Sequence, residues 1–319
     1  MTANGSTNLA MAGALMRLAS ALLASGLMVG NRPATDRHVE RSERCTMPAG
    51  WLGVARAHPR FVIFGEIHGT REAPAFVGKV ACSLANKGDR VLVAIEHSAV
   101  NDEAFQAAWR LPDPNFQAAI TKVGWAGRRD GVASAAMLDL LLQLHRLKEA
   151  GRSVAIVAFN GFRDEDQRRR FAGLPGQGPH EAAQAENIRK AADAGHYDHI
   201  LVLTGNLHAR KKPIEENSWV YRPMAMQLAS PGEIVSLNMR TAGGKMWNCI
   251  IRPDVQLDRT KPVPDDAIEC GDRPTKGWAN MKAAPFMALR VKNGGEDDNY
   301  DGIFWVGRVS GSGPALAYP

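Results

Sequence analysis

Short apolar runs recur along the first two thirds of the chain and are separated by longer, more polar segments. The runs are rich in β-branched residues and are bounded by charged residues or glycine, a pattern typical of buried strands. We therefore predict strands at residues 61–64, 90–96, 153–159 and 199–204. Shorter apolar runs predict three more strands, at residues 233–238, 246–251 and 303–306.

The segments between these strands carry apolar residues at helical spacing. We predict interrupted helical structure over residues 102–127, and helices at residues 74–87, 133–150 and 181–194, each followed by a glycine. The first strand, the helix and the next strand form a βαβ unit, which implies parallel pairing with a right-handed crossover. Repetition of such units predicts the α/β class, with a mostly parallel central sheet flanked by helices.

The pattern becomes irregular in the last third of the chain, where proline and glycine are frequent. Residues 253–297 show little periodicity, and we expect long ordered loops there. We therefore predict a single domain over residues 51–319, with an irregular strand- and loop-rich C-terminal part from residue 241 onward.

The N-terminal segment differs from the rest in composition. Residues 9–30 are almost wholly small and apolar, with Arg17 as the only charged residue. This predicts a signal peptide or N-terminal anchor over residues 1–30, followed by a polar linker at 31–50. The protein is then expected to be exported, either periplasmic or membrane-anchored, and to contact a membrane only through this segment. A mis-assigned start would instead leave a cytoplasmic protein.

The chain has four cysteines and no CxxC pair. An even number of cysteines in an exported protein indicates disulfides. We predict a bond between Cys249 and Cys270, because both lie in the turn-rich C-terminal third, and then one between Cys45 and Cys82. The alternative is four free thiols, with Cys82 buried in its helix.

Charge and motifs exclude several classes of function. The 319 residues carry a formal charge of +6, but the denser basic runs, 168–170 and 210–212, are only three residues long. Because no long basic run with interleaved aromatic residues occurs, we expect no nucleic-acid partner. The sequence also lacks G-x-S-x-G, G-x-x-x-x-G-K-[ST], G-x-G-x-x-G and H-E-x-x-H. The sequence therefore carries no signature of a serine hydrolase, a P-loop nucleotide hydrolase or a dinucleotide-binding enzyme.

Polar side chains follow each of the four longer strands. They are Glu66 and His68 after the first strand, Glu96 and His97 at the end of the second, Asn160 after the third, and His208 after the fourth. The carboxyl ends of parallel strands lie along one edge of a sheet, which is where such sheets bind their ligands. We therefore expect these groups to face a common site.

The spacing of these groups selects among them. Glu66 and His68 are two residues apart, so they point the same way in extended backbone. Glu96 and His97 are adjacent, so only one faces the site; we choose Glu96 and expect His97 either to be structural or to lie behind the residues that face the ligand. A histidine beside a carboxylate can act as a general base. Two or three histidines with a glutamate can equally bind a divalent metal.

These motifs resemble those of a known superfamily. The segments GEIHGTRE at 65–72 and GNLHARK at 205–211, with Glu96 between them, are similar to erythromycin esterase-like proteins, ChaN-like haem-uptake lipoproteins and Tiki/TraB proteins. The His-Gly-Thr part resembles the esterases, whereas the Glu-x-His spacing and the second motif look nearer to ChaN. The resemblance covers residues 58–240. It maps the acidic and histidine positions of the superfamily onto Glu66, His68, Glu96 and His208, followed by Arg71 and Glu72.

The resemblance implies several functions, because members of the superfamily differ in what this site does. The first is a hydrolase of a small-molecule substrate, in which His68 is the general base on a water and Glu66 or Glu96 orients it. His208 or Arg71 would stabilise the developing negative charge.

Two alternatives make haem or a divalent metal the cofactor. One is a protein that binds haem or another iron ligand without turnover, with His208, Tyr197 or Tyr221 as the iron ligand. The other is a metal-dependent peptidase with Glu66, His68 and His208 as metal ligands. An inactive member of the superfamily, with a vestigial cluster, is the remaining reading.

Overall fold

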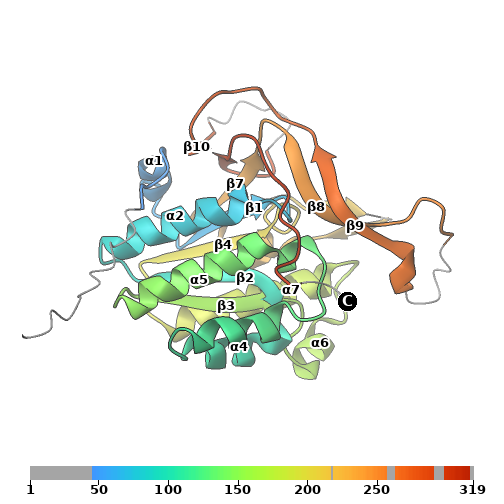
Figure 1. Ribbon diagram of the computed structural model, residues 1–319, viewed down its shortest axis with the longest axis horizontal. Helices are drawn as coiled ribbons and strands as arrows, with labels where there is room; N and C mark the ends of the chain where they lie inside the picture. Colours follow the sequence, from blue (N-terminus) through green and yellow to red (C-terminus); the bar gives the residue numbers. More distant parts are fainter. Residues whose placement is uncertain (1–44, 217, 257–262, 291–297, 317–319) are drawn as a thin grey trace, which may run out of the picture. The chain divides into compact units, whose positions relative to one another are not determined.

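Seven strands form the central sheet of the computed structural model (Figure 1). They are β1 (Phe61–Glu66), β2 (Val91–Ser98), β3 (Val154–Asn160), β4 (His199–Gly205), β7 (Ile234–Arg240), β10 (Phe286–Leu289) and β11 (Gly302–Trp305). Their order in the sheet is β10-β11-β7-β1-β4-β2-β3, and every pairing is parallel except that of β10 with β11. The predicted fold class, a mostly parallel sheet flanked by helices, is confirmed.

The structure describes residues 45–216, 218–256, 263–290 and 298–316. The predicted signal peptide or anchor at residues 1–30 lies outside these ranges. None of the helices within these ranges is long and apolar enough to cross a membrane.

The first two strands are parallel, as the βαβ pattern predicts, but they are not neighbours. Strand β4 lies between them and pairs with both, with Ile63 opposite Val202 and Val93 opposite Leu201. The inference that β1 and β2 pair directly is therefore wrong. A βαβ pattern specifies the direction of two strands but leaves room for a third strand between them, here one that arrives more than a hundred residues later in the sequence.

Helices cover both faces of the sheet. Helices α2 (Glu72–Asn86) and α5 (Ala135–Glu149) pack on the face that carries Val62 and Phe64 (Figure 1). Helices α7 (Gly178–Ala194) and α8 (Met224–Leu228) pack on the face that carries Phe61 and Ile63. Successive side chains of a strand point to opposite faces, so a strand buried on both sides is apolar throughout.

Shorter elements complete the described part of the chain. The helices are α1 (Trp51–Ala55), α3 (Asp102–Trp109), α4 (Asn115–Gly124) and α6 (Glu165–Phe171), with single 3₁₀ turns at Ala99–Asn101, Gly131–Ala133, Pro231–Glu233 and Asp265–Ala267. Two short strands, β5 (Ile214–Glu216) and β6 (Trp219–Tyr221), form a hairpin. Ser134 caps α5 by accepting from the amide of Met137, and Asp164 caps α6 by accepting from the amide of Gln167.

A separate antiparallel hairpin consists of β8 (Gly244–Ile251) and β9 (Ile268–Thr275). Together with β10, strand β9 corrects the expectation that residues 253–297 contain only loops. Both faces of β9 are at least partly exposed, and its charged residues include Glu269 and Arg273, so its sequence shows no apolar alternation. It is a strand because it pairs with β8, not because of a buried face.

Both predicted disulfides are present. Cys249 lies directly opposite Cys270 in the β8–β9 hairpin, and the two are bonded. Cys45 is bonded to Cys82 and so ties the segment before α1 to helix α2. Two disulfides in one chain indicate an oxidising environment.

Phe64 should contribute strongly to the stability of the core. Its ring is fully buried in β1 and contacts the rings of Phe76 and Phe304, at centroid distances of 6.0 and 5.4 Å. We expect Phe64→Ala to lower the free energy of unfolding by about 3–5 kcal/mol, because it removes buried surface and leaves a cavity. Denaturation in urea measures this, and Leu52→Ala, at a side chain that is 70% exposed, is the control with a change within about 0.5 kcal/mol.

Candidate functional site

The end of β1 places Glu66 and His68 in contact. Glu66 is buried, whereas the side chain of His68 is 30% exposed, and their Oε1 and Nδ1 atoms are 3.0 Å apart. The preceding residue, Gly65, lies against the turn that follows β4: a Cβ atom there would lie 2.7 Å from the Cβ of Ala209. The lack of a side chain at this position therefore lets the first motif approach the second closely.

Glu96, at the end of β2, reaches across the end of β4. Its Oε2 atom accepts hydrogen bonds from the Thr204 hydroxyl at 2.7 Å and from the Gly205 amide at 2.6 Å. The same atom lies 3.5 Å from Nε2 of His68, and the other carboxylate oxygen lies 3.5 Å from Nε2 of His208. Glu96 is thus a buried carboxylate between two imidazole rings.

His208 has a second carboxylate partner that the sequence analysis missed. Its Nδ1 atom is 2.7 Å from Oε1 of Glu181, whose other oxygen accepts from the Met224 amide at 2.7 Å. Glu181 lies in the first turns of α7 and is buried. From the sequence, Glu181 is predicted only as the first residue of a helix, because it is far from any strand end. The one sequence signal for its burial is that it precedes two alanines, Ala182 and Ala183, which are small enough for close packing of the helix.

Carboxylates and imidazoles alternate in this group of five side chains, in the order Glu66, His68, Glu96, His208, Glu181. We call this set the acid–imidazole chain. Each imidazole has a short contact from Nδ1 to an outer glutamate and a longer contact from Nε2 to Glu96. Hydrogen bonds of this kind are normally 2.7–3.2 Å. The two Nδ1 contacts therefore fix the orientation of each ring, whereas the two Nε2 atoms are held less tightly.

Burial and charge set the protonation of the carboxylates. Burial raises the pKa of Glu66, and the neighbouring His68 opposes this only in part. Burial also acts to raise the pKa of Glu96, but the charges of His68 and His208 and the Thr204 hydroxyl outweigh it and lower this pKa. Glu96 therefore stays ionised at lower pH than Glu66 does.

At both imidazoles the neighbouring carboxylates outweigh burial and raise the pKa. Burial alone would lower the pKa of His68, but Glu96 and Glu66 raise it well above its ordinary value. Burial is likewise outweighed at His208, where Glu181 and Glu96 raise the pKa while the charge of His68 opposes them. Both imidazoles therefore keep their protons to higher pH than a free histidine does.

His97 faces away from the acid–imidazole chain. Its buried ring lies between those of Phe105 and Trp125, and its Nδ1 atom is 3.2 Å from Arg128 Nη1. Burial, with the Arg128 charge next in size, lowers the pKa of His97 to about 3. Arg128 also forms a bidentate ion pair with Asp130.

The turn that carries His68 is held from outside the sheet. The carbonyl of Gly69 accepts hydrogen bonds from the Trp247 amide at 2.9 Å and the Ser312 amide at 2.8 Å. Gly69 has φ of +74°, and a Cβ atom there would lie 2.0 Å from the Trp247 carbonyl oxygen. Only glycine adopts this positive φ without strain and also leaves room for the Trp247 carbonyl oxygen.

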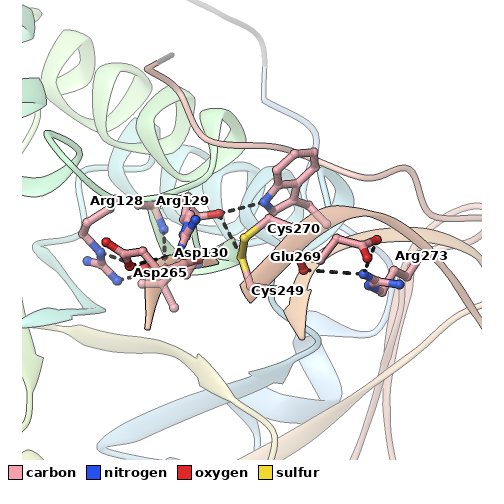
Figure 2. The surroundings of a disulfide bond; sticks show 11 residues. Arg128, Arg129, Asp130, Cys249, Asp265, Glu269, Cys270 and Arg273 are labelled. Carbon is pink, nitrogen blue, oxygen red and sulfur yellow. Dashed lines mark hydrogen bonds and ion pairs between the residues drawn. A yellow bond between two sulfur atoms is a disulfide. The ribbon is translucent and has the colours of Figure 1, made fainter. Parts of the chain in front are cut away.

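The β8–β9 hairpin also contacts the loop that carries Arg129. The Arg129 carbonyl accepts from Trp247 Nε1 at 2.8 Å and lies 3.4 Å from Sγ of Cys249 (Figure 2). The Arg129 guanidinium donates to Asp265 at 3.0 Å. The disulfide-bonded hairpin therefore rests on two of the segments that surround the acid–imidazole chain.

Arg71 and Glu72 are not brought into the acid–imidazole chain. Arg71 donates from Nε to the Gly311 carbonyl at 3.2 Å, and Glu72 accepts from the Ser310 amide at 3.0 Å. Both residues lie at the start of α2 and hold the segment 310–311 against it. Their hydrogen bonds therefore join α2 to the C-terminal segment and not to the acid–imidazole chain.

The two tyrosines proposed as haem ligands lie in different places. Tyr197 precedes β4 and is therefore at the opposite end of that strand from His208. Tyr221 is buried in β6 and donates to Glu216 at 3.4 Å. Of the three alternative iron ligands, His208 is the one that belongs to the acid–imidazole chain.

No group of three or more His, Cys, Asp or Glu side chains within the described ranges is arranged so that it could hold a metal ion. In the predicted set of Glu66, His68 and His208, Glu66 contacts Nδ1 of His68, whereas Nε2 of each ring lies near a different oxygen of Glu96. These three side chains therefore do not point at one position.

Comparison with known proteins shows a shared fold. No protein-family model matches the sequence, and no curated protein matches it. A mutant of erythromycin esterase EreC in its open conformation is 11% identical, with a TM-score of 0.52 over 82% of this chain and 93% of that one. A succinoglycan biosynthesis protein is 10% identical, with a TM-score of 0.54 over 83% and 91%. A Bacillus cereus protein is 14% identical, with a TM-score of 0.53 over 83% and 92%.

The superfamily fold inferred from the sequence motifs is thereby confirmed, since one of these structures is an erythromycin esterase. At these identities the comparison supports the fold alone.

Glu181 should control the protonation of His208. We expect Glu181→Gln to lower the pKa of His208, because the substitution removes the carboxylate charge from Nδ1 while keeping an oxygen there. An NMR titration of the histidine ring signals measures the shift. Glu186→Gln is the matched control on the same helix, since Glu186 pairs with Arg170 and Lys190. An unchanged His208 pKa in Glu181→Gln would contradict the assignment.

His97 should make the fold sensitive to acid. Its pKa is lowered from 6.5 to about 3, so the unfolded chain takes up a proton at His97 between these values and the folded chain does not. The free energy of unfolding should therefore fall as the pH drops below 6.5, by about 1.4 kcal/mol per pH unit from this residue. Denaturation of wild type and His97→Leu as a function of pH measures it. We expect a shallower slope in the variant, and equal slopes would refute the role of His97.

Proposed function

We propose that this protein is a hydrolase that cleaves an ester of a small molecule through an activated water. The observation that carries this proposal is the acid–imidazole chain, in which two partly exposed histidines share one buried carboxylate. The histidine side chains are 30% and 22% exposed, so solvent and substrate reach the imidazoles first and the glutamates lie beneath them. Paired imidazoles set to different protonation states can supply both an acid and a base.

The charged neighbours of the two rings are the basis on which we assign these two roles. The charge of His68 acts to lower the pKa of His208, so we assign His208 as the general base, with its Nδ1–H held by Glu181. Glu96 and Glu66 raise the pKa of His68 well above its ordinary value, so we assign His68 as the imidazolium that stabilises negative charge on the substrate oxygen. This reverses the roles expected from the sequence, where His68 was the base.

The proposed reaction proceeds by addition of water. His208 Nε2 takes a proton from the water as the water oxygen bonds to the ester carbonyl carbon, and the carbonyl electron pair moves to oxygen beside His68. The alkoxide then leaves with the proton that His208 had received, and a carboxylic acid remains. Glu96, ionised between the rings, stabilises the doubly protonated pair of imidazoles that forms at the midpoint.

Two further observations support an exported esterase. The fold is shared with an erythromycin esterase, a protein named for its action on an ester. The two disulfides fit an oxidising compartment, which agrees with an apolar N-terminal segment that directs export.

Loss of either histidine should abolish most of the turnover. We expect His68→Asn and His208→Asn each to lower kcat by about 10²–10⁴-fold, the range that general acid–base catalysis supplies. A panel of methyl and aryl esters, assayed by acid release, measures this. His199→Asn is the matched control. His199 is the first residue of β4, at the opposite end of that strand from the acid–imidazole chain, and it pairs with Asp89.

The pH profile adds a second readout to the same experiment. The rate should rise as His208 loses its proton and fall as His68 does, and the falling limb should be absent in His68→Asn. Wild-type rates in both histidine variants would refute the proposed mechanism.

A further inference from the structure

Arg210 lies beside the acid–imidazole chain and takes no part in it. It follows His208 by two residues, in the turn in which its amide donates to the Leu207 carbonyl at 3.3 Å. The turn is fixed on both sides: the Ala225 amide donates to the His208 carbonyl at 3.0 Å, and the Tyr300 hydroxyl donates to the Asn206 carbonyl at 2.8 Å. Arg210 is therefore held at the same edge of the sheet as the two imidazoles.

Among the residues that the structure describes, no carboxylate pairs with Arg210, in contrast to its neighbours. Lys211 binds Asp301 at 2.7 Å, and Lys212 binds Asp298 at 3.4 Å. The side chain of Arg210 forms no hydrogen bond or ion pair with any residue that the structure describes, and its Nε atom is buried. A buried donor without an acceptor is unfavourable, and the residue as a whole is only half-buried, so its positive charge is open to a partner from outside.

Two buried tyrosines lie near enough to Arg210 for its charge to act on their phenols. Tyr221 and Tyr300 are both buried, and their hydroxyls are already engaged, with Glu216 and with the Asn206 carbonyl. Burial raises the pKa of both phenols, and the positive charge of Arg210 opposes this at each. The charge of Glu181 also acts to raise the pKa of Tyr221.

We propose that Arg210 binds a carboxylate of the substrate. The guanidinium presents a planar set of donors that matches a carboxylate in a bidentate manner. Glu181 and Glu216 lie near the same tyrosine, so a monoanion is favoured over a dianionic phosphate. The inference rests on the proposed hydrolase and names its substrate class: an ester that carries a free carboxylate at a short distance from the scissile bond.

Binding of unreactive amides tests this without turnover. Succinamic acid carries one carboxylate and succinamide carries none, and titration calorimetry of the full chain gives both dissociation constants. We expect succinamic acid to bind the wild-type protein about tenfold or more tightly than succinamide, as expected for a charge-assisted hydrogen-bonded pair. Arg210→Gln should remove this preference.

Lys212→Gln is the matched control, because it removes the same charge from the same loop at an exposed ion pair. It should keep the preference within about twofold, since exposed ion pairs contribute little. Equal binding of the two amides to wild type, or an intact preference in Arg210→Gln, would overturn the assignment. Hydrolysis of monomethyl succinate is measured separately: an Arg210-dependent preference without hydrolysis would refute the hydrolase and leave the carboxylate site standing.

Discussion

A carboxylate that is both buried and ionised has to be surrounded by donors, and this requirement at Glu96 organises the functional edge of the sheet. Glu96 obtains its donors from the Thr204 hydroxyl, the Gly205 amide and two imidazoles. The first two donors belong to β4, so Glu96 receives these two hydrogen bonds only if β4 lies beside β2 in the observed register. The position of β4 in the sheet and the charge of the imidazoles are therefore coupled through one side chain.

The same coupling explains why glycine occurs on both sides of the imidazoles. A Cβ atom at Gly205 would lie 2.9 Å from Nε2 of His68, and one at Gly65 would press on Ala209. Larger residues at either position would separate the two motifs and leave Glu96 without one of its partners. The close approach of backbone segments is thus part of the electrostatics of the site, because the pKa of each ring depends on its distance from a carboxylate.

Much of this arrangement could be predicted from the sequence. Apolar runs gave the strands, parallel strands share a carboxyl edge, and that edge brings together Glu66, His68, Glu96 and His208. Strand order could not be predicted in this way, because apolar runs buried on both faces carry no information about which strand lies beside which. Glu181 was missed for a different reason: whether a glutamate in a helix points outward or inward depends on the register of the helix on the sheet.

The C-terminal part resisted prediction because its elements depend on contacts distant in sequence. Strand β9 has no apolar face and exists through its pairing with β8 and the bond between Cys249 and Cys270. Arg71 and Glu72 looked like site residues because they follow the first motif closely. Their partners at Gly311 and Ser310 lie about 240 residues away and leave no local trace in the sequence.

The carbonyl of Gly69 links the geometry of the site to contacts that are distant along the chain. Its two donors are the amides of Trp247 and Ser312, so the turn beside His68 is held by two segments of the C-terminal part. Contacts between residues so far apart in sequence form slowly, because closing a long loop costs conformational entropy before the contact is made. The histidines and glutamates of the acid–imidazole chain all lie at or before residue 208, but the turn that carries His68 depends on the packing of residues beyond 240.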